Sequence, residues 1–215
     1  ILKRASPSCG MERVKVYTEA GMPVTNDAGV FARILKEKWP TLPIEEEGRL
    51  NDAHLRVRFI EHVFCRHRWR TLVRRGLSRR NLIAFHTAHK LLLRAHNEAG
   101  YRRLGKIVAS AGTISDEELF SSYEDEFHRV LMTRATRKRH ANVLYHAIGY
   151  LKRDLDPSEK QEIVALIEDY RNELVPLIVP ITLLRHHVAK HGVGYLQGQL
   201  YLEPHPRELM LRNRV

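Results

Sequence analysis

The loop Ser6–Gly10, with the sequence SPSCG, carries the residues of this chain that are best suited to chemistry. Cys9 lies among proline and glycine just after a short apolar run, a setting that can activate a thiol or present it to a metal. Ser6, three residues earlier, could orient a substrate or a water molecule by hydrogen bonding. The alternative is a loop thiol without a role. Cys65 follows apolar helical residues instead, which predicts a buried core thiol.

The 13 histidines raise the question of a metal site. His86 and His89 are spaced i, i+3, and His187 and His191 are spaced i, i+4, so each pair could share a helix face. A zinc site needs a third ligand of defined identity, and the HExxH motif is absent. Most of the histidines stand near arginine or lysine, which disfavours a cation. The pattern therefore favours phosphate contact, base stacking or a polar surface over metal binding.

The positive charge is concentrated in two blocks. The 215 residues include 36 Lys plus Arg and 25 Asp plus Glu, a formal net charge of +11. Residues 64–110 hold 12 bases and one acid, residues 129–153 hold seven bases and no acid, and the rest of the chain sums to −7. Like charges at helical spacing repel, so such blocks favour a polyanionic partner, with nucleic acid ahead of solubility or lipid headgroups.

Arginine and lysine can bind phosphates, while tyrosine, histidine and arginine planes can stack on unpaired bases, as in RNA loops. Both kinds of residue occur in two predicted helices, RRNLIAFHTAHKLLLRAHN and KRHANVLYHAIGYLKR, and in the YRR run between them. The alternative for Tyr145 and Tyr150 is packing between helices. The candidate nucleic-acid-binding residues are Arg79, Arg80, His86, His89, Lys90, Arg94, Arg102, Arg103, Arg137, Lys138, Arg139, His140, Tyr145 and His146.

Several functional classes lack support in the sequence. There is no Walker loop, no GxGxxG and no GxSxG motif, which argues against nucleotide hydrolysis, Rossmann redox chemistry and ordinary hydrolase chemistry. No run of about 18 apolar residues occurs, so we expect no membrane span and no membrane partner. Two cysteines are too few for a disulfide scaffold, and the first residues do not read as a signal peptide. The expected location is the cytoplasm, and the oligomeric state is left open.

The elements that must position these residues change character near residue 50. Before it, the pattern predicts a strand, a turn-rich loop that includes GMPVTND, a helix that stops at Pro40, and a short strand in TLPIEE. After it, the pattern is helical throughout, so the expected fold class is α+β: a truncated α/β piece followed by a larger all-α domain. Helices are expected from Asn51 or Asp52, over 78–96, 98–111, from Ser115 to the RATRKRH run, and over 138–153, 156–174 and 181–191.

The order of the motifs also resembles known families over essentially the whole chain. ILKRASPSCG, the Gly-rich stretch after it and the GVFARIL helix resemble the C-terminal half of the TudS-type thiouracil desulfidase domain. Five later segments resemble the YbgA-like helical domain: IEEEGRLNDAHLRVRFIEHVF, FHTAHKLLLRAHN, YRRLGKIVA, KRHANVLYHAIGYLK and LYLEPHPREL. Both domains in this order are similar to the RudS group, bacterial desulfidases that act on 4-thiouridine in tRNA. The expected domains are residues 1–48 and 49–215.

The resemblance implies a mechanism. In that family three cysteines hold a [4Fe–4S] cluster with one open iron, which binds the thiocarbonyl sulfur while water attacks the ring carbon. Cys9 matches the last of the three cysteines, and Ser6 matches an active-site serine. The other two cysteines and a catalytic glutamate lie upstream in the family. Because the chain opens on Ile1 without methionine, we expect that this part is missing, that the fragment holds no cluster, and that it is inactive alone.

The helical domain is then expected to bind tRNA or another RNA. Two alternatives remain at this point: a non-catalytic helical nucleic-acid-binding module, and a DNA-associated accessory protein, because charge does not distinguish duplex DNA from folded RNA.

Overall fold

A computed structural model describes residues 1–17 and 20–215 and divides the chain into two compact units. These are Ile1–Ile60 and Glu61–Val215, and each is described by itself. The division lies within helix α2 (Ala53–Arg74), twelve residues after the expected domain boundary at 48/49. The prediction of two domains with separate roles stays a prediction.

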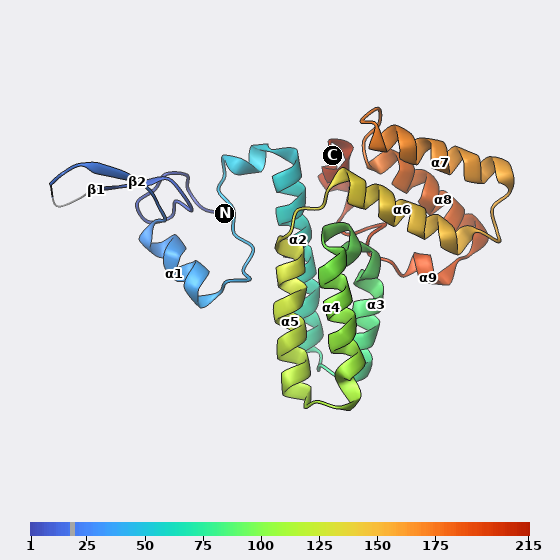
Figure 1. The fold of residues 1–215 in the computed structure, drawn as a ribbon, viewed down its shortest axis with the longest axis horizontal. Helices are drawn as coiled ribbons and strands as arrows, with labels where there is room; N and C mark the ends of the chain where they lie inside the picture. Colours follow the sequence, from blue (N-terminus) through green and yellow to red (C-terminus); the bar gives the residue numbers. More distant parts are fainter. Residues whose placement is uncertain (18–19) are drawn as a thin grey trace. The chain divides into compact units, whose positions relative to one another are not determined.

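The first unit contains helix α1 (Val30–Lys38) and an antiparallel strand pair, β1 (Val14–Tyr17) and β2 (Pro23–Asp27) (Figure 1). It ends with a 3₁₀ turn, Arg49–Asn51, and the first residues of α2. The strand pair lies where the sequence predicted a turn-rich loop. The two strands that were predicted make only one isolated parallel bridge, between Leu2 and Glu46. Each of those segments is short, and one bridge cannot form the continuous ladder that defines a strand.

Three consecutive glutamates tie the end of this unit together. The buried carboxylate of Glu45 lies 2.7 Å from Nε of Arg49 and 3.0 Å from Nη2 of Arg58. Glu46 accepts a hydrogen bond from the backbone N–H of Met11 at 2.7 Å. Glu47 accepts from the backbone N–H of Arg4 in the same way, at 2.8 Å. The acidic run in IEEEGR is therefore used for internal contacts.

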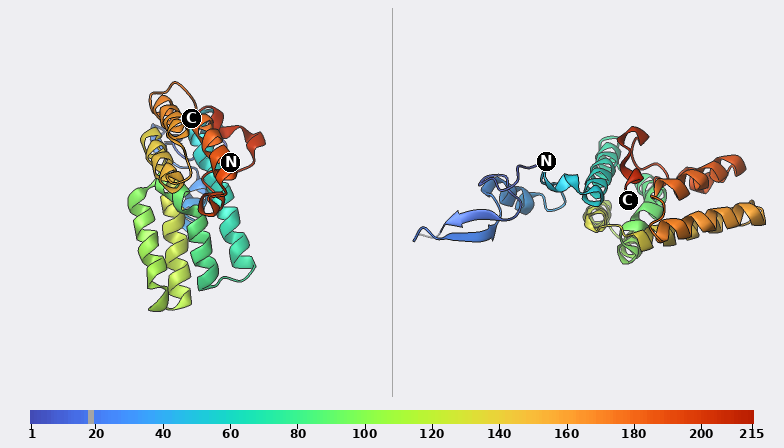
Figure 2. Two further views of the ribbon diagram at one scale, coloured as in Figure 1. Left: turned by 90° about the vertical axis from the view of Figure 1, so that its right-hand side faces the viewer. Right: turned by 90° about the horizontal axis from the view of Figure 1, so that it is seen from above.

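Among the described residues of the second unit, all regular elements are helices, joined by turns and short irregular segments. In Figure 1 and in the left view of Figure 2, α2–α5 run side by side, and α6–α9 form a second helical group. Short 3₁₀ turns follow α4 and close the chain, at Ser110–Gly112, Arg207–Leu209 and Leu211–Asn213. The helices are α3 (Arg79–His96), α4 (Glu98–Ala109), α5 (Asp116–Met132), α6 (Arg137–Leu151), α7 (Pro157–Arg171), α8 (Ile178–His191) and α9 (Gly194–Gln197).

Aromatic side chains fill the core of the first helical group. The ring of Trp69 on α2 lies 5.4 Å from Phe85, 5.5 Å from Tyr123 and 6.3 Å from Phe127. Ring pairs of this kind stabilise a fold beyond the contribution of their buried area. These aromatic contacts therefore stabilise the packing of α2, α3 and α5. Cys65 is fully buried beside these rings, as predicted, and burial raises the pKa of its thiol to about 12.

Polar side chains begin most of these helices where the sequence indicated. Ser78 Oγ accepts from the N–H of Asn81, and Ser115 Oγ accepts from the N–H of Glu118. Asp156 and Glu159 form the reciprocal capping box at the start of α7, with proline at the first helical position. The helix predicted from Ser115 to the RATRKRH run stops just before that run. It ends at Met132, and Thr136 caps a new helix.

A buried ion pair joins α2 to the last residues of the chain. Glu61 and Arg212 are 2% and 3% exposed, and Nη2 of Arg212 lies 2.8 Å from Oε1 of Glu61. His96 Nε2 lies 3.3 Å from the other oxygen, and His96 Nδ1 pairs with the carbonyl of Thr133 at 2.7 Å. Burial alone would raise the pKa of Glu61, but Arg212 and His96 hold it well below its usual range. The carboxylate therefore stays ionised inside the unit.

The fold class predicted from the sequence is confirmed, since helices dominate the described chain. Among the described residues, no helix combines the length and the hydropathy needed to cross a membrane.

Candidate nucleic-acid interface

The SPSCG loop lies against the first turn of α1. Ser6 Oγ accepts hydrogen bonds from the N–H groups of Ser8 and Cys9, at 3.3 and 3.2 Å. The carbonyl of Ser8 accepts from two amides of the first turn, Phe31 and Ala32, at 2.9 and 3.1 Å. A Cβ on Gly29 would lie 2.3 Å from that carbonyl oxygen, so only glycine allows this approach. The first amides of α1 are therefore directed to the loop and not to an external anion.

The side chains around Cys9 do not provide the ligands of an iron–sulfur cluster. Its thiol is half-buried, and within residues 1–17 and 20–215 no group of three His, Cys, Asp or Glu suited to a metal includes it. The other cysteine, Cys65, lies in the second unit and is fully buried. A [4Fe–4S] cluster is normally held by several thiolates, so we derive no chemical step through one.

On helices α4 and α5, two carboxylates each hold two arginines. Glu98 of α4 lies 2.8 Å from Arg94 and 3.4 Å from Arg102. The buried Glu126 of α5 lies 2.8 Å from Arg103 and 2.6 Å from Arg129. Each group of three carries one net positive charge and keeps unused guanidinium donors, which match phosphate oxygens. We call these two groups the shared-carboxylate clusters.

An aromatic cluster, consisting of Tyr101, His146, Tyr150 and Tyr195, lies beside Arg94. The rings of Tyr150 and Tyr195 are 4.4 Å apart, and those of His146 and Tyr150 are 5.3 Å apart. The guanidinium of Arg94 lies 5.7 Å from the ring centre of Tyr101. Burial, with Tyr150 nearby, raises the pKa of Tyr195 far above its usual value. These side chains come from α3, α4, α6 and α9, and Tyr150 is 41% exposed.

Three of the predicted nucleic-acid-binding histidines are not on the surface. His86 and His89 of α3 and His140 of α6 are buried, which corrects the exposed edge that the sequence predicted for them. His86 pairs with the hydroxyl of Tyr123 at 3.2 Å, and His140 pairs with that of Tyr201 at 3.0 Å. Burial lowers the pKa of His86 to about 4, and that of His89 and His140 to about 3. All three are neutral core residues at neutral pH.

The run Arg137–Arg139 divides into two structural arginines and one exposed lysine. Arg139 donates to the carbonyl of His96 at 2.8 Å, and Arg137 donates to the carbonyl of Tyr170 at 2.7 Å and stacks on its ring. Those carbonyls lie in the last turns of α3 and α7, where cations are favoured. Only Lys138 extends into solvent without such a role.

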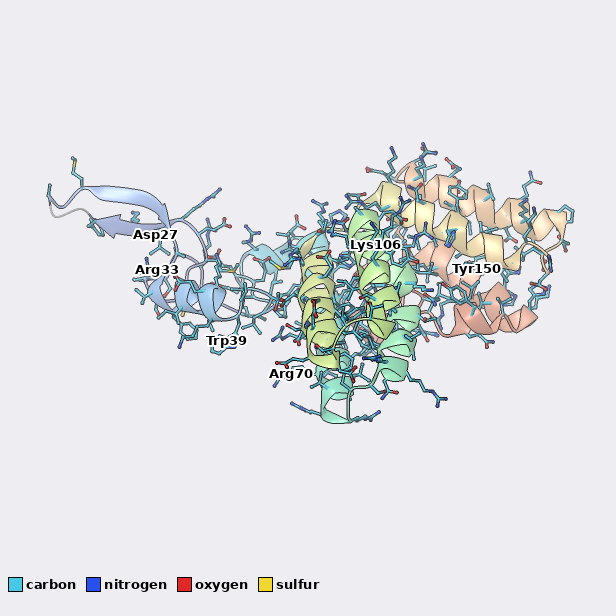
Figure 3. All side chains as sticks on the ribbon, turned by 60° about the horizontal axis from the view of Figure 1, so that its bottom comes forward. Asp27, Arg33, Trp39, Arg70, Lys106 and Tyr150 are labelled. Carbon is cyan, nitrogen blue, oxygen red and sulfur yellow. The ribbon has the colours of Figure 1, made fainter. Side chains whose placement is uncertain are left out.

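The remaining predicted residues lie at several places on the same unit. Arg79 pairs with Asp116 at 2.7 Å, and the hydroxyl of Tyr145 donates to Glu168, so both are occupied. Within the described part of the chain, Arg80 and Lys90 pair with no acid. Figure 3 shows further exposed side chains on α2 and α4, labelled Arg70 and Lys106.

Sequence reasoning missed two members of the aromatic cluster, Tyr101 and Tyr195. Tyr101 has the helical spacing of a core residue, and Tyr195 lies in a tail segment that gave no clear pattern. Their partners come from helices that are remote in sequence, so no local signal could group them. The structure brings together Arg94, Arg102 and His146 from the predicted set.

Fold and site together define a class: a basic helical protein unit with aromatic rings set beside arginines. The family model described as "Protein of unknown function (DUF1722)" matches residues 90–206, and the chain belongs to this family. The "Uncharacterized protein YbgA" of Escherichia coli (strain K12) is 33% identical over 152 residues, which are 70% of this chain and 90% of the relative. No solved structure gives a significant match. The predicted YbgA-like helical domain is thereby confirmed.

Proposed function

We propose that the helical unit binds RNA and that its natural ligand is tRNA. The observation that carries the proposal is the aromatic cluster beside Arg94. Exposed rings can stack on unpaired bases, and the neighbouring guanidinium can bind the phosphates between those bases. The shared-carboxylate clusters supply the cationic surface. Duplex DNA is the weaker candidate, because its bases are stacked inside the helix and offer no face to Tyr150.

The charge distribution supports a polyanion. The two basic blocks of the sequence, 64–110 and 129–153, both lie wholly within the helical unit. Two of their arginines, Arg137 and Arg139, cap helix ends, but Lys90, Lys106 and Lys138 pair with no acid among the described residues. Binding that neutralises such charges releases counterions from the nucleic acid, so it must weaken as salt rises.

The test is titration of the full chain into fluorescently labelled bulk tRNA, followed by anisotropy from 50 to 200 mM salt. We expect affinity to fall steeply across this range. The Tyr150→Ala variant should lose roughly 5- to 150-fold in affinity, the equivalent of stacking on one base. Because the stack requires an unpaired base, the variant should bind a fully paired duplex as the parent does.

Tyr17→Ala is the matched control, because Tyr17 is an exposed tyrosine of the other unit. It should bind tRNA like the parent. Salt-independent binding, no binding, or equal losses in both tyrosine variants would refute the proposal.

The resemblance of residues 1–48 supports a second proposal, conversion of 4-thiouridine in tRNA to uridine by a protein that contains this chain. The favouring observation is the ordered loop in which Ser6 fixes the amides of Ser8 and Cys9. Since one thiol cannot hold a cluster, we expect anaerobic reconstitution of this chain to give no stoichiometric iron or sulfide, and no loss of 4-thiouridine absorbance from tRNA. Stoichiometric iron and sulfide would contradict that expectation.

A further inference from the structure

A cluster of three side chains lies where α7 begins and α8 ends, outside the proposed RNA surface. The two helices pack side by side and run in opposite directions, so the first turn of α7 meets the last turn of α8 (Figure 1). Glu159 is in that first turn, and His187 and His191, four residues apart, share one face of the last turns of α8.

The potential ligand atoms of the three side chains converge. Glu159 Oε1 lies 3.6 Å from Nδ1 of His187, and its Oε2 lies 3.8 Å from Nε2 of His191. One ligand atom from each residue lies within 4.8 Å of the other two. In a tetrahedral zinc site with bonds near 2.1 Å, ligand atoms are about 3.4 Å apart. Small side-chain rotations therefore suffice to surround an ion.

The second observation is that the histidine nitrogens lack hydrogen bonds. His187 is only 4% exposed, yet neither of its ring nitrogens has a hydrogen-bond partner among the described residues, and the same is true of His191 Nε2. A buried polar group without a partner is costly and rare in folded proteins. A metal ion bound to both rings would satisfy the nitrogens that face Glu159.

We propose that Glu159, His187 and His191 form a site for a divalent transition-metal ion, with Zn²⁺ as the expected occupant. Two imidazoles and one carboxylate are a normal zinc ligand set, and three protein ligands leave the fourth position open to water or a substrate. Other first-row ions with a preference for nitrogen are expected to compete in the usual order, with Mg²⁺ and Ca²⁺ excluded.

In the absence of a metal, the ammonium of Lys190 pairs with the carboxylate of Glu159. Its Nζ lies 2.5 Å from Glu159 Oε1, and its side chain is half exposed, so it can leave without disturbing the core. Because this ammonium competes with a cation for the same oxygen, Lys190→Ala should bind zinc more tightly than the parent. A purely structural role for the cluster predicts no such gain.

The experiment is a titration of untagged, chelator-treated full chain with Zn²⁺, read by competition with a chelating dye. Co²⁺ is used as a second probe, since its visible spectrum reports four-coordinate geometry. We expect one equivalent of metal to bind. The variants His191→Ala and Glu159→Gln should each lose roughly 100-fold or more in zinc affinity, because loss of a residue that only supports a metal ligand already costs about 10- to 100-fold. Glutamine can retain the capping box, so the helix start is kept.

His186→Ala is the matched control, because His186 is the neighbouring histidine, exposed on another face of α8. It should bind zinc like the parent. Absence of stoichiometric zinc binding, binding that survives both ligand variants, or an unchanged affinity in Lys190→Ala would each overturn the proposal.

Discussion

Replacing Arg212 by methionine tests whether the buried ion pair with Glu61 holds the helical unit together. Methionine keeps much of the side-chain length and removes the charge. The change leaves Glu61, 2% exposed, without the partner that lies 2.8 Å from its carboxylate. It also removes a hydrogen bond to the carbonyl of Tyr201 at 2.5 Å and the stack on the Tyr201 ring, 5.0 Å away.

The magnitude follows from the charge that is left behind. Breaking a buried pair by removing one partner costs about 3–5 kcal/mol, because the other ion stays uncompensated in a medium of low dielectric constant. A domain is stable by only about 5–15 kcal/mol, so the variant should lose a large fraction of its free energy of unfolding. For a unit of this size, the midpoint of thermal unfolding should fall by roughly 6–20 °C.

Urea unfolding of the full chain, followed by circular dichroism at 222 nm, measures the change. Arg214→Met is the control, since Arg214 is an exposed arginine two residues further along the chain. Its effect should stay within about 0.5 kcal/mol, as for most surface substitutions. The double variant Glu61→Gln/Arg212→Met removes both charges and should recover part of the loss.

The effect of pH sharpens the test. In the parent the pKa of Glu61 is low, so its contribution is present above pH 4.5 and disappears as pH falls toward the folded pKa. Without Arg212, the effect of burial dominates and the pKa of Glu61 rises. As pH falls, Glu61 is therefore protonated in the variant before it is protonated in the parent, and the cost of its buried charge disappears. The difference between parent and variant should therefore shrink from pH 7.5 to pH 5.5. A loss under 1 kcal/mol, or one that grows at pH 5.5, would refute the reasoning.

Two further predictions concern the basic run and the buried histidines. Lys138→Glu should weaken tRNA binding in anisotropy titrations without changing the thermal midpoint, whereas Arg139→Met should lower unfolding free energy by about 1–3 kcal/mol because the carbonyl of His96 loses its partner. Equal stability of the two variants would contradict this division of roles. Burial lowers the pKa of His86, His89 and His140 below the unfolded value of 6.5, so the free energy of unfolding should fall as pH drops below 6.5, by about 2 kcal/mol per histidine near pH 5, and urea midpoints should fall with it. Midpoints that stay constant from pH 7 to 5 would show that these rings are not held neutral.

Helix positions were predictable because their signals are local. Ser78, Ser115 and Asp156 each satisfy an amide three residues away, and a bond of that range can be recognised from sequence alone. The first unit was harder to predict, because β1 and β2 depend on pairing between segments that have no strong strand pattern. The correct expectation there was α1, whose helical pattern is local.

The candidate site was less predictable, because sequence shows residue type but not exposure. His86 and His140 look like RNA-binding residues beside their basic neighbours, yet each faces a buried tyrosine. Arg139 looks like a phosphate contact and instead caps another helix. The pair His187 and His191 was visible as a spacing, but Glu159 joins it from a different helix and could not have been chosen from sequence.

The shared-carboxylate clusters have a consequence for the entropy of binding. A free arginine side chain carries about 2 kcal/mol of rotamer entropy, which a ligand must overcome to immobilise it. Arg94, Arg103 and Arg129 are already held by Glu98 or Glu126, so part of that loss occurs when the protein folds. A polyanion that docks on these groups meets guanidiniums that are already oriented. The two acids, although they reduce the net positive charge, therefore prepare the surface for an anionic partner.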